Sequence, residues 1–192
     1  MPMPTGIRLR GAAPAEGERF NYLGTHRYIV TLPVHGSEAV FTTADRTVAV
    51  LQSLRESCWH HHFDAYAYCF LPDRLLLLVR GKAEDSNLKD FLREFRRSSS
   101  ELLASILGRP IWGKKYLERV LRKTELSPDA ARRIYSLPVK LNLASSALEY
   151  PLQGSFVEKM SFFYSPPPEK KRLRPPLRPR RPGGPKTRTT RR

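Results

Sequence analysis

Aromatic and basic residues are interleaved over residues 112–123, a composition that suits contact with unpaired bases and their phosphates. Trp112 and Tyr116 can stack on bases, while the cations between and after them can pair with the backbone. These cations are Lys114, Lys115, Arg119, Arg122 and Lys123. A second series consists of Lys89, Arg93 and Arg97 at four-residue spacing, with Arg96 beside them, and would form a basic stripe along a helix. A merely solvated surface is the alternative for both sets.

The run His60-His61-His62 suggests a metal site, but its spacing argues against one. Consecutive residues on a helix point about 100° apart, so three in a row cannot all face one ion. At the end of a helix, histidines instead favour the negative end of the macrodipole. Cys58 and Cys69 lie in apolar segments without ligand spacing, so we expect reduced core cysteines. We therefore expect no metal site and no cofactor.

The chain of 192 residues carries 34 Lys and Arg against 18 Asp and Glu, a net charge of +16. This charge predicts attraction to polyanions, nucleic acid first. Residues 166–192 hold eleven Lys or Arg, one Glu and eight Pro, a composition typical of disorder. We expect a disordered leader (1–19), a folded domain (20–157) and a disordered basic tail (158–192). Without an apolar run of membrane-spanning length or a signal peptide, we expect a soluble, cytoplasmic protein that binds no membrane.

Hydrophobic periodicity predicts the elements that must position these side chains. We expect strands over 27–34, 64–71, 74–81 and 112–123. A first helix should follow an N-cap at Thr43, with the apolar positions Val48, Leu51, Leu54, Cys58 and Trp59. A second should follow an N-cap at Ser86 and end at Gly108, with the apolar stripe Leu88, Phe91, Leu92, Phe95, Leu102, Leu103 and Ile106. A third should cover 127–137, with Ser127 at the N-cap and Pro128 after it.

This order predicts an α+β fold, a ferredoxin-like β-α-β-β-α-β sandwich with an antiparallel sheet and an extra C-terminal helix. Four strings in the same order resemble the REP-associated tyrosine transposases, which are single-tyrosine HUH transposases of bacteria. The strings are "YIVTLPVHG" (28–36), "AYCFLPDRLLLLV" (67–79), "IWGKKYLERVLR" (111–122) and "RIYSLPVKLNLASSALEYPLQGS" (133–155). The resemblance spans about residues 20–156. It implies a surface for single-stranded or hairpin DNA, with the 112–123 strand close to the foot of the hairpin.

Carried over residue by residue, the resemblance implies a degenerate active site. The two metal-binding histidines of the family fall at Arg74 and Leu76, and its catalytic tyrosine falls at Arg133. Leucine has no donor atom and arginine stays cationic, so neither can hold a metal. A guanidinium can bind a phosphate bidentately, however, so the substitutions favour binding over chemistry.

The leading hypothesis is therefore a domesticated, catalytically inactive protein that binds structured single-stranded nucleic acid, either a DNA hairpin or an RNA stem-loop. One alternative is an active transposase in which Tyr135 or Tyr116 is the nucleophile and Mg²⁺ or Mn²⁺ the cofactor. Another is a protein-interaction module, in a ribonucleoprotein or as a homodimer. The residues expected to bind nucleic acid are Arg74, Lys89, Arg93, Arg96, Arg97, Lys114, Lys115, Tyr116, Arg119, Arg122, Lys123, Arg132, Arg133 and Lys140.

Overall fold

The computed structural model describes residues 20–125 and 127–164, in which strands and helices alternate along the chain. Its elements are β1 (Arg27–Pro33), η1 (His35–Ser37), α1 (Ala44–His60), β2 (Phe63–Leu71), β3 (Arg74–Gly81), α2 (Leu88–Leu107), β4 (Leu117–Val120), α3 (Ser127–Tyr135), α4 (Leu137–Lys140), η2 (Ala147–Glu149), β5 (Gln153–Gly154) and α5 (Met160–Tyr164). The expected disordered leader and most of the expected tail lie outside the described residues, so both remain predictions.

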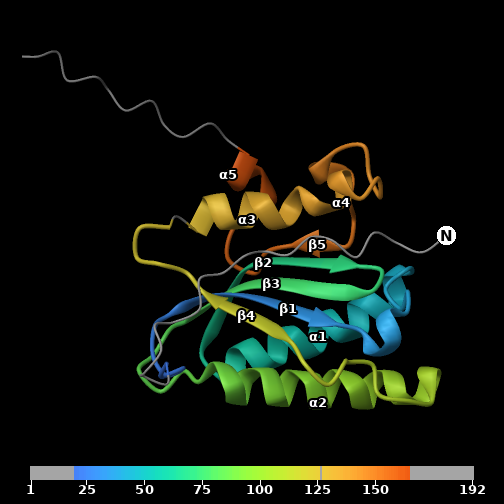
Figure 1. The fold of residues 1–192 in the computed structure, drawn as a ribbon, viewed down its shortest axis with the longest axis horizontal. Helices are drawn as coiled ribbons and strands as arrows, with labels where there is room; N and C mark the ends of the chain where they lie inside the picture. Colours follow the sequence, from blue (N-terminus) through green and yellow to red (C-terminus); the bar gives the residue numbers. More distant parts are fainter. Residues whose placement is uncertain (1–19, 126, 165–192) are drawn as a thin grey trace, which may run out of the picture.

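The strands form one antiparallel sheet in the order β4-β1-β3-β2-β5 (Figure 1). The first four strands and the helices α1 and α2 follow the β-α-β-β-α-β sequence, which confirms the predicted ferredoxin-like α+β fold. β5 was not expected. It has two residues, which is too short for any alternation to show in the sequence, and it pairs with β2 at Tyr68 and Cys69.

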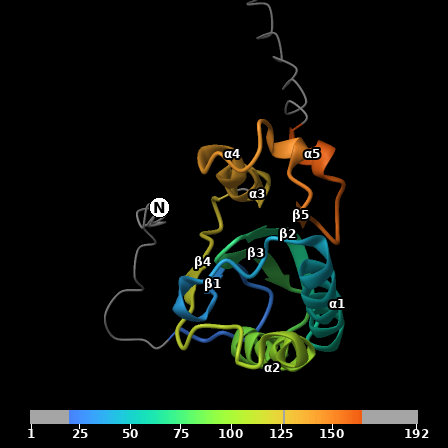
Figure 2. The same cartoon turned by 90° about the vertical axis from the view of Figure 1, so that its right-hand side faces the viewer.

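Helices cover both faces of the sheet. Figures 1 and 2 show α1 and α2 on one face and α3, α4 and α5 on the other. Along β3, Leu75 and Leu77 belong to the core beneath α1 and α2, whereas Leu76 and Leu78 belong to the core beneath α3. A strand buried on both faces has no polar side, which explains its unbroken run of leucines.

Helix α1 begins after Thr43 as predicted, but the Thr43 side chain makes no capping hydrogen bond. Leu54 and Cys58 are buried, while Val48 and Trp59 are 61% and 76% exposed. Val48 and Trp59 therefore lie outside the buried face of α1, which follows residues 50, 54 and 58.

Helix α2 is capped by Asn87 rather than by Ser86. The Asn87 side chain accepts hydrogen bonds from the backbone N–H groups of Lys89 and Asp90. The Ser86 hydroxyl instead donates to the carbonyl of His62 and closes the preceding loop. The helix ends as predicted at Gly108, which has a φ of 65°.

The apolar stripe of α2 is only partly buried. Residues Leu88 to Phe95 of the stripe and Leu103 are 0% exposed, whereas Leu102 and Ile106 are 49% and 61% exposed. Leu102 and Ile106 therefore lie outside the packed face of α2, toward its C-terminal end.

The strand expected over 112–123 is reduced to Leu117–Val120. Its ladder with β1 ends at the pair Thr31–Leu117, and two residues further along β1 stands Pro33. Proline has no N–H group to continue the ladder. Gly113 donates to the Pro33 carbonyl at 2.8 Å, and Trp112 forms an isolated bridge with Val34.

The helix expected over 127–137 ends at Tyr135, and a separate helix α4 starts at Leu137. Pro138 lacks the N–H that would continue the α-helical ladder, which accounts for the break. Beyond the expected boundary at residue 157, α5 adds Phe163 to the core beneath α3, where it is 1% exposed. The Arg132 guanidinium donates to the Phe163 carbonyl at 3.0 Å, so the described fold continues to residue 164.

Candidate nucleic-acid interface

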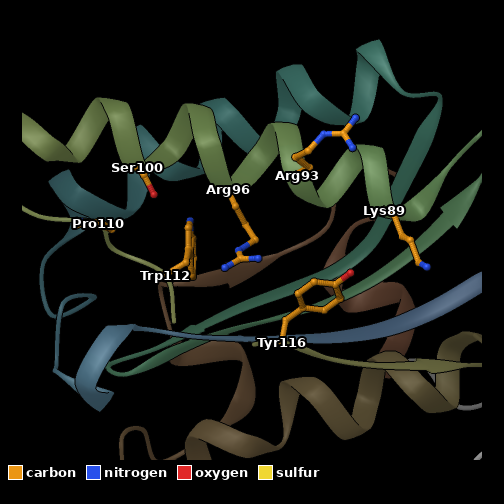
Figure 3. Close-up of a pocket in the computed structure, with 7 residues that line it drawn as sticks. All are labelled: Lys89, Arg93, Arg96, Ser100, Pro110, Trp112 and Tyr116. Atoms are coloured by element: carbon orange, nitrogen blue, oxygen red, sulfur yellow. The ribbon is translucent and has the colours of Figure 1, made fainter. Parts of the chain in front are cut away.

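A cavity of about 390 Å³ lies between α2 and the segment 110–116 that leads into β4 (Figure 3). It combines cations from one series with aromatic rings from the other, although the two series lie apart in the sequence. All three of its cations come from α2, and its aromatic rings come from the opposite segment. The lining residues are Lys89, Arg93, Arg96, Ser100, Pro110, Trp112 and Tyr116.

The helical spacing of α2 places its four contributions on one face. Lys89, Arg93, Arg96 and Ser100 follow one another at intervals of four, three and four residues, which keeps them in register along the helix. The opposite face of α2 packs into the core through residues such as Phe91 and Phe95. The cations therefore stand on a helix that cannot rotate away from the cavity.

Trp112 anchors the other wall. Its indole N–H donates to the Ser99 hydroxyl at 2.8 Å, and Ser99 donates to the Phe95 carbonyl at 2.5 Å. The centre of the indole ring also lies 5.7 Å from the centre of the Phe41 ring and 5.6 Å from that of the Phe95 ring. These contacts hold the segment 110–116 against α2 although it is not a regular strand.

Arg96 crosses the cavity from α2 to the segment 110–116. Its Nη2 donates to the Gly113 carbonyl at 2.5 Å, and its guanidinium carbon lies 5.6 Å from the centre of the Tyr116 ring. Among the described residues, its buried Nε has no hydrogen-bond partner. A buried N–H without an acceptor costs free energy, so Arg96 is a donor in need of a partner.

Tyr116 and Tyr22 extend an aromatic surface along the same side. The Lys89 ammonium lies 4.6 Å above the Tyr22 ring, and the Tyr22 hydroxyl donates to the carboxylate of Glu118 at 2.9 Å. Burial, followed by the Glu118 charge, raises the pKa of Tyr116, and burial together with Glu118 raises the pKa of Tyr22 to about 12. Both phenols are therefore neutral at physiological pH.

The cavity is positively charged, because three of its seven lining residues are cationic and none is acidic. Arg93 pairs with Asp90 at 2.7 Å but is highly exposed, so solvent screens this pair. Lys114 and Lys115 lie in sequence between Trp112 and Tyr116 and are exposed. They add two cations beside the cavity.

Four further predicted cations do not line the cavity. Arg97 forms ion pairs with Glu94 at 2.7 Å and Glu101 at 2.8 Å. Arg119 pairs with Glu125 at 2.8 Å. Arg122 is exposed in the turn after β4, as is Lys123.

The remaining predicted residues lie on the α3 side of the sheet. Arg74 binds its neighbour Asp73 bidentately, at 2.9 and 2.6 Å. Arg132 pairs with Asp129, whereas Arg133 and Lys140 are exposed on α3 and α4. The structure thus separates these residues from Lys89, Arg93, Arg96 and Tyr116, which line the cavity on the α2 side.

Two of the positions that the resemblance assigned to an active site, Arg74 and Leu76, lie on β3. Leu76 is 3% exposed and packs in the core beneath α3. In the part of the chain that the structure describes, no group of three or more His, Cys, Asp or Glu side chains could hold a metal ion.

The two candidate nucleophiles differ in accessibility. Tyr135 is 0% exposed and donates its hydroxyl to the carbonyl of Gly154 at 2.8 Å, so a phosphodiester cannot reach it without local opening. Tyr116 is partly exposed in the cavity.

Sequence comparison gives no family: no family model matches the chain, and no curated protein matches it. Comparison with solved structures does give matches. A REP-associated tyrosine transposase bound to a REP hairpin matches with a TM-score of 0.60 at 18% identity, over 73% of this chain and 82% of that one. The chain has a transposase-like fold.

A candidate transposase from Deinococcus radiodurans R1 also matches, at 16% identity over 61% of this chain and 93% of that one, with a TM-score of 0.44.

Among the described residues, no helix combines the length and hydrophobicity needed to cross a bilayer.

Sequence reasoning did not single out Ser100, Pro110 or Tyr22. Nothing in their local sequence distinguishes them, because their role depends on which segment faces α2. The interleaving of aromatic and basic residues over 112–123 was the signal that did identify Trp112 and Tyr116.

Proposed function

We propose that this transposase-like chain binds DNA hairpins that carry unpaired nucleotides, through the cavity between α2 and segment 110–116. The observation that carries the proposal is the convergence of Lys89, Arg93 and Arg96 on the rings of Trp112 and Tyr116. Cations beside aromatic rings are the combination that binds single strands, since phosphates pair with the cations and bases stack on the rings. The hairpin in the matching transposase structure supports a hairpin as the ligand.

We further propose that binding occurs without strand cleavage. The support comes from residue chemistry: Arg74 and Leu76 cannot hold a divalent cation, and Arg133 cannot act as a phenolic nucleophile. A phenol with a raised pKa, such as Tyr116, is also a poor nucleophile without a metal-activated phosphate.

The test uses purified protein and a 5′-labelled hairpin with single-stranded flanks, with and without Mn²⁺, on native and denaturing gels. We expect a retarded complex on the native gel and no band that survives denaturant. A metal-dependent covalent band would instead identify an active transposase. An RNA hairpin of the same sequence, bound more tightly than the DNA, would overturn the choice of DNA.

The site itself is tested by variants on one helix. Lys89→Ala and Arg93→Ala together should weaken hairpin binding about tenfold or more and lower the salt dependence by about 0.7 log units per lost phosphate contact. Arg97→Ala is the control for each single change, Lys89→Ala or Arg93→Ala, because it removes one charge from the same helix outside the cavity. Equal losses of hairpin affinity in the control and in the cavity variants would show that the cavity is not the binding site.

A further inference from the structure

The polar groups that line the cavity are mainly hydrogen-bond donors. Lys89, Arg93 and Arg96 can only donate. The indole N–H of Trp112 is already taken by Ser99, and the carbonyl of Gly113 already accepts from Arg96. Only the hydroxyls of Ser100 and Tyr116 can either donate or accept. A ligand in this cavity is therefore met by more donors than acceptors.

Arg96 is the innermost of these donors. Figure 3 shows its side chain running from α2 into the space between Trp112 and Tyr116. With Nη2 on the Gly113 carbonyl, the guanidinium is held in one orientation, and its Nε is buried without a partner among the described residues. The guanidinium N–H groups that face the cavity can donate to a ligand acceptor, whereas a ligand donor that faces Arg96 would be left without a partner.

The dimensions suit one nucleotide. A volume of about 390 Å³ falls in the range of small-molecule sites. Exposed Lys89 and Arg93 stand at one end of the α2 face, where they can bind the phosphate, and Arg96 lies deeper beside the two aromatic rings. A base that enters between these groups presents its edge to Arg96.

We propose that the cavity selects an unpaired base whose major-groove edge presents a carbonyl oxygen, guanine or thymine, over adenine and cytosine, whose same edge presents an amine. This inference rests on the proposed function and adds base preference to it. Guanine presents O6 and N7, and thymine presents O4, all of which are acceptors. Adenine and cytosine present an exocyclic amine at the equivalent position, which would face the donors of Arg96.

The experiment measures affinity for hairpins that share one stem and carry short single-stranded flanks of one base type. Titrations by fluorescence anisotropy in LiCl avoid quadruplex formation by guanine. We expect guanine and thymine flanks to bind about tenfold more tightly than adenine and cytosine flanks, which corresponds to about 1.4 kcal/mol. Inosine keeps O6 without the 2-amino group and should bind like guanine. 2-Aminopurine keeps the amino group without O6 and should bind like adenine.

Arg96→Lys tests the residue, because lysine keeps the charge but lacks the fork and Nε. It should reduce the preference to less than about twofold and leave the salt dependence unchanged. Arg97→Lys is the control and should keep the preference. Thermal melting of both variants checks that they fold, and the comparison of inosine with 2-aminopurine needs no variant.

The outcomes separate the two proposals. Equal affinity for all four bases, with binding that still depends on Lys89 and Arg93, would overturn the base preference and leave the proposed function intact. A preference that survives Arg96→Lys would overturn the role of Arg96. The proposed function itself would be overturned if the protein did not bind hairpins, or if hairpin binding did not depend on Lys89 and Arg93.

Discussion

The indole N–H of Trp112 and the hydroxyl of Ser99 meet at 2.8 Å in the core, where Ser99 is 0% exposed and Trp112 6%. This hydrogen bond ties the segment before β4 to the middle of α2. It therefore closes one wall of the candidate interface.

Ser99→Ala should destabilise the fold by about 1–3 kcal/mol, because the buried indole N–H loses its acceptor. Urea unfolding at pH 7 measures the change. The double variant Ser99→Ala/Trp112→Phe removes both partners and should cost less than the sum of the two single changes. Strict additivity would show that this hydrogen bond contributes nothing.

Gly81→Ala should destabilise the fold more than Gly113→Ala. A Cβ at Gly81 would overlap the carbonyl oxygen of Gly24. Gly24 cannot easily move away, because its N–H donates to the Ser86 carbonyl at 2.9 Å. A Cβ at Gly113 would meet its nearest atoms, in Pro33, at 3.4 Å. We expect a loss of about 1–3 kcal/mol at Gly81, by overpacking, and a much smaller one at Gly113. Comparable thermal shifts for the two variants would contradict the described loop.

Stability should fall as the pH rises from 10 toward 12. Burial is the main cause that raises the pKa of Tyr22, Tyr28 and Tyr150 from 10.0 to about 12 in the folded chain. Above pH 10 the unfolded chain loses these protons while the folded chain keeps them, so rising pH favours unfolding. The stabilisation is fully present below pH 10. Tyr22→Phe removes one of these groups and should reduce the drop in urea midpoint between pH 9 and 11.5, whereas an unchanged drop would exclude Tyr22 as a contributor.

Removal of residues 165–192 should lower the salt dependence of hairpin binding, because these residues carry most of the net positive charge. The preference for hairpins over random single strands should persist, because the cavity lies in the part of the chain that remains. Competition titrations at several salt concentrations measure both quantities. Loss of the hairpin preference would place recognition in the tail and not in the cavity.

The sequence by itself determined the order of β1, α1, β2, β3, α2, β4 and α3, and most of their ends. The unbroken apolar run of β3, helical spacing in α1 and α2, and the αL-favouring Gly108 are local properties, and each predicted its element correctly. The clearest local errors were the cap at Ser86 and the extent of the strand near 112–123. In both cases a distant partner decided the outcome: the His62 carbonyl claimed the Ser86 hydroxyl, and Pro33 ended the ladder of β4.

Only the tertiary structure decided which charges act together. In the sequence, Lys89, Arg93, Arg96 and Arg97 form one stripe, but the fold turns the first three toward Trp112 and Tyr116 and pairs Arg97 with two glutamates. Arg74 likewise could bind a phosphate by its chemistry, yet its guanidinium is occupied by Asp73. Residue type and near neighbours set what Arg97 and Arg74 bind, because their acidic partners lie within four residues. The packing that brings residues 110–116 against α2 joins segments that lie too far apart in the sequence for local patterns to encode.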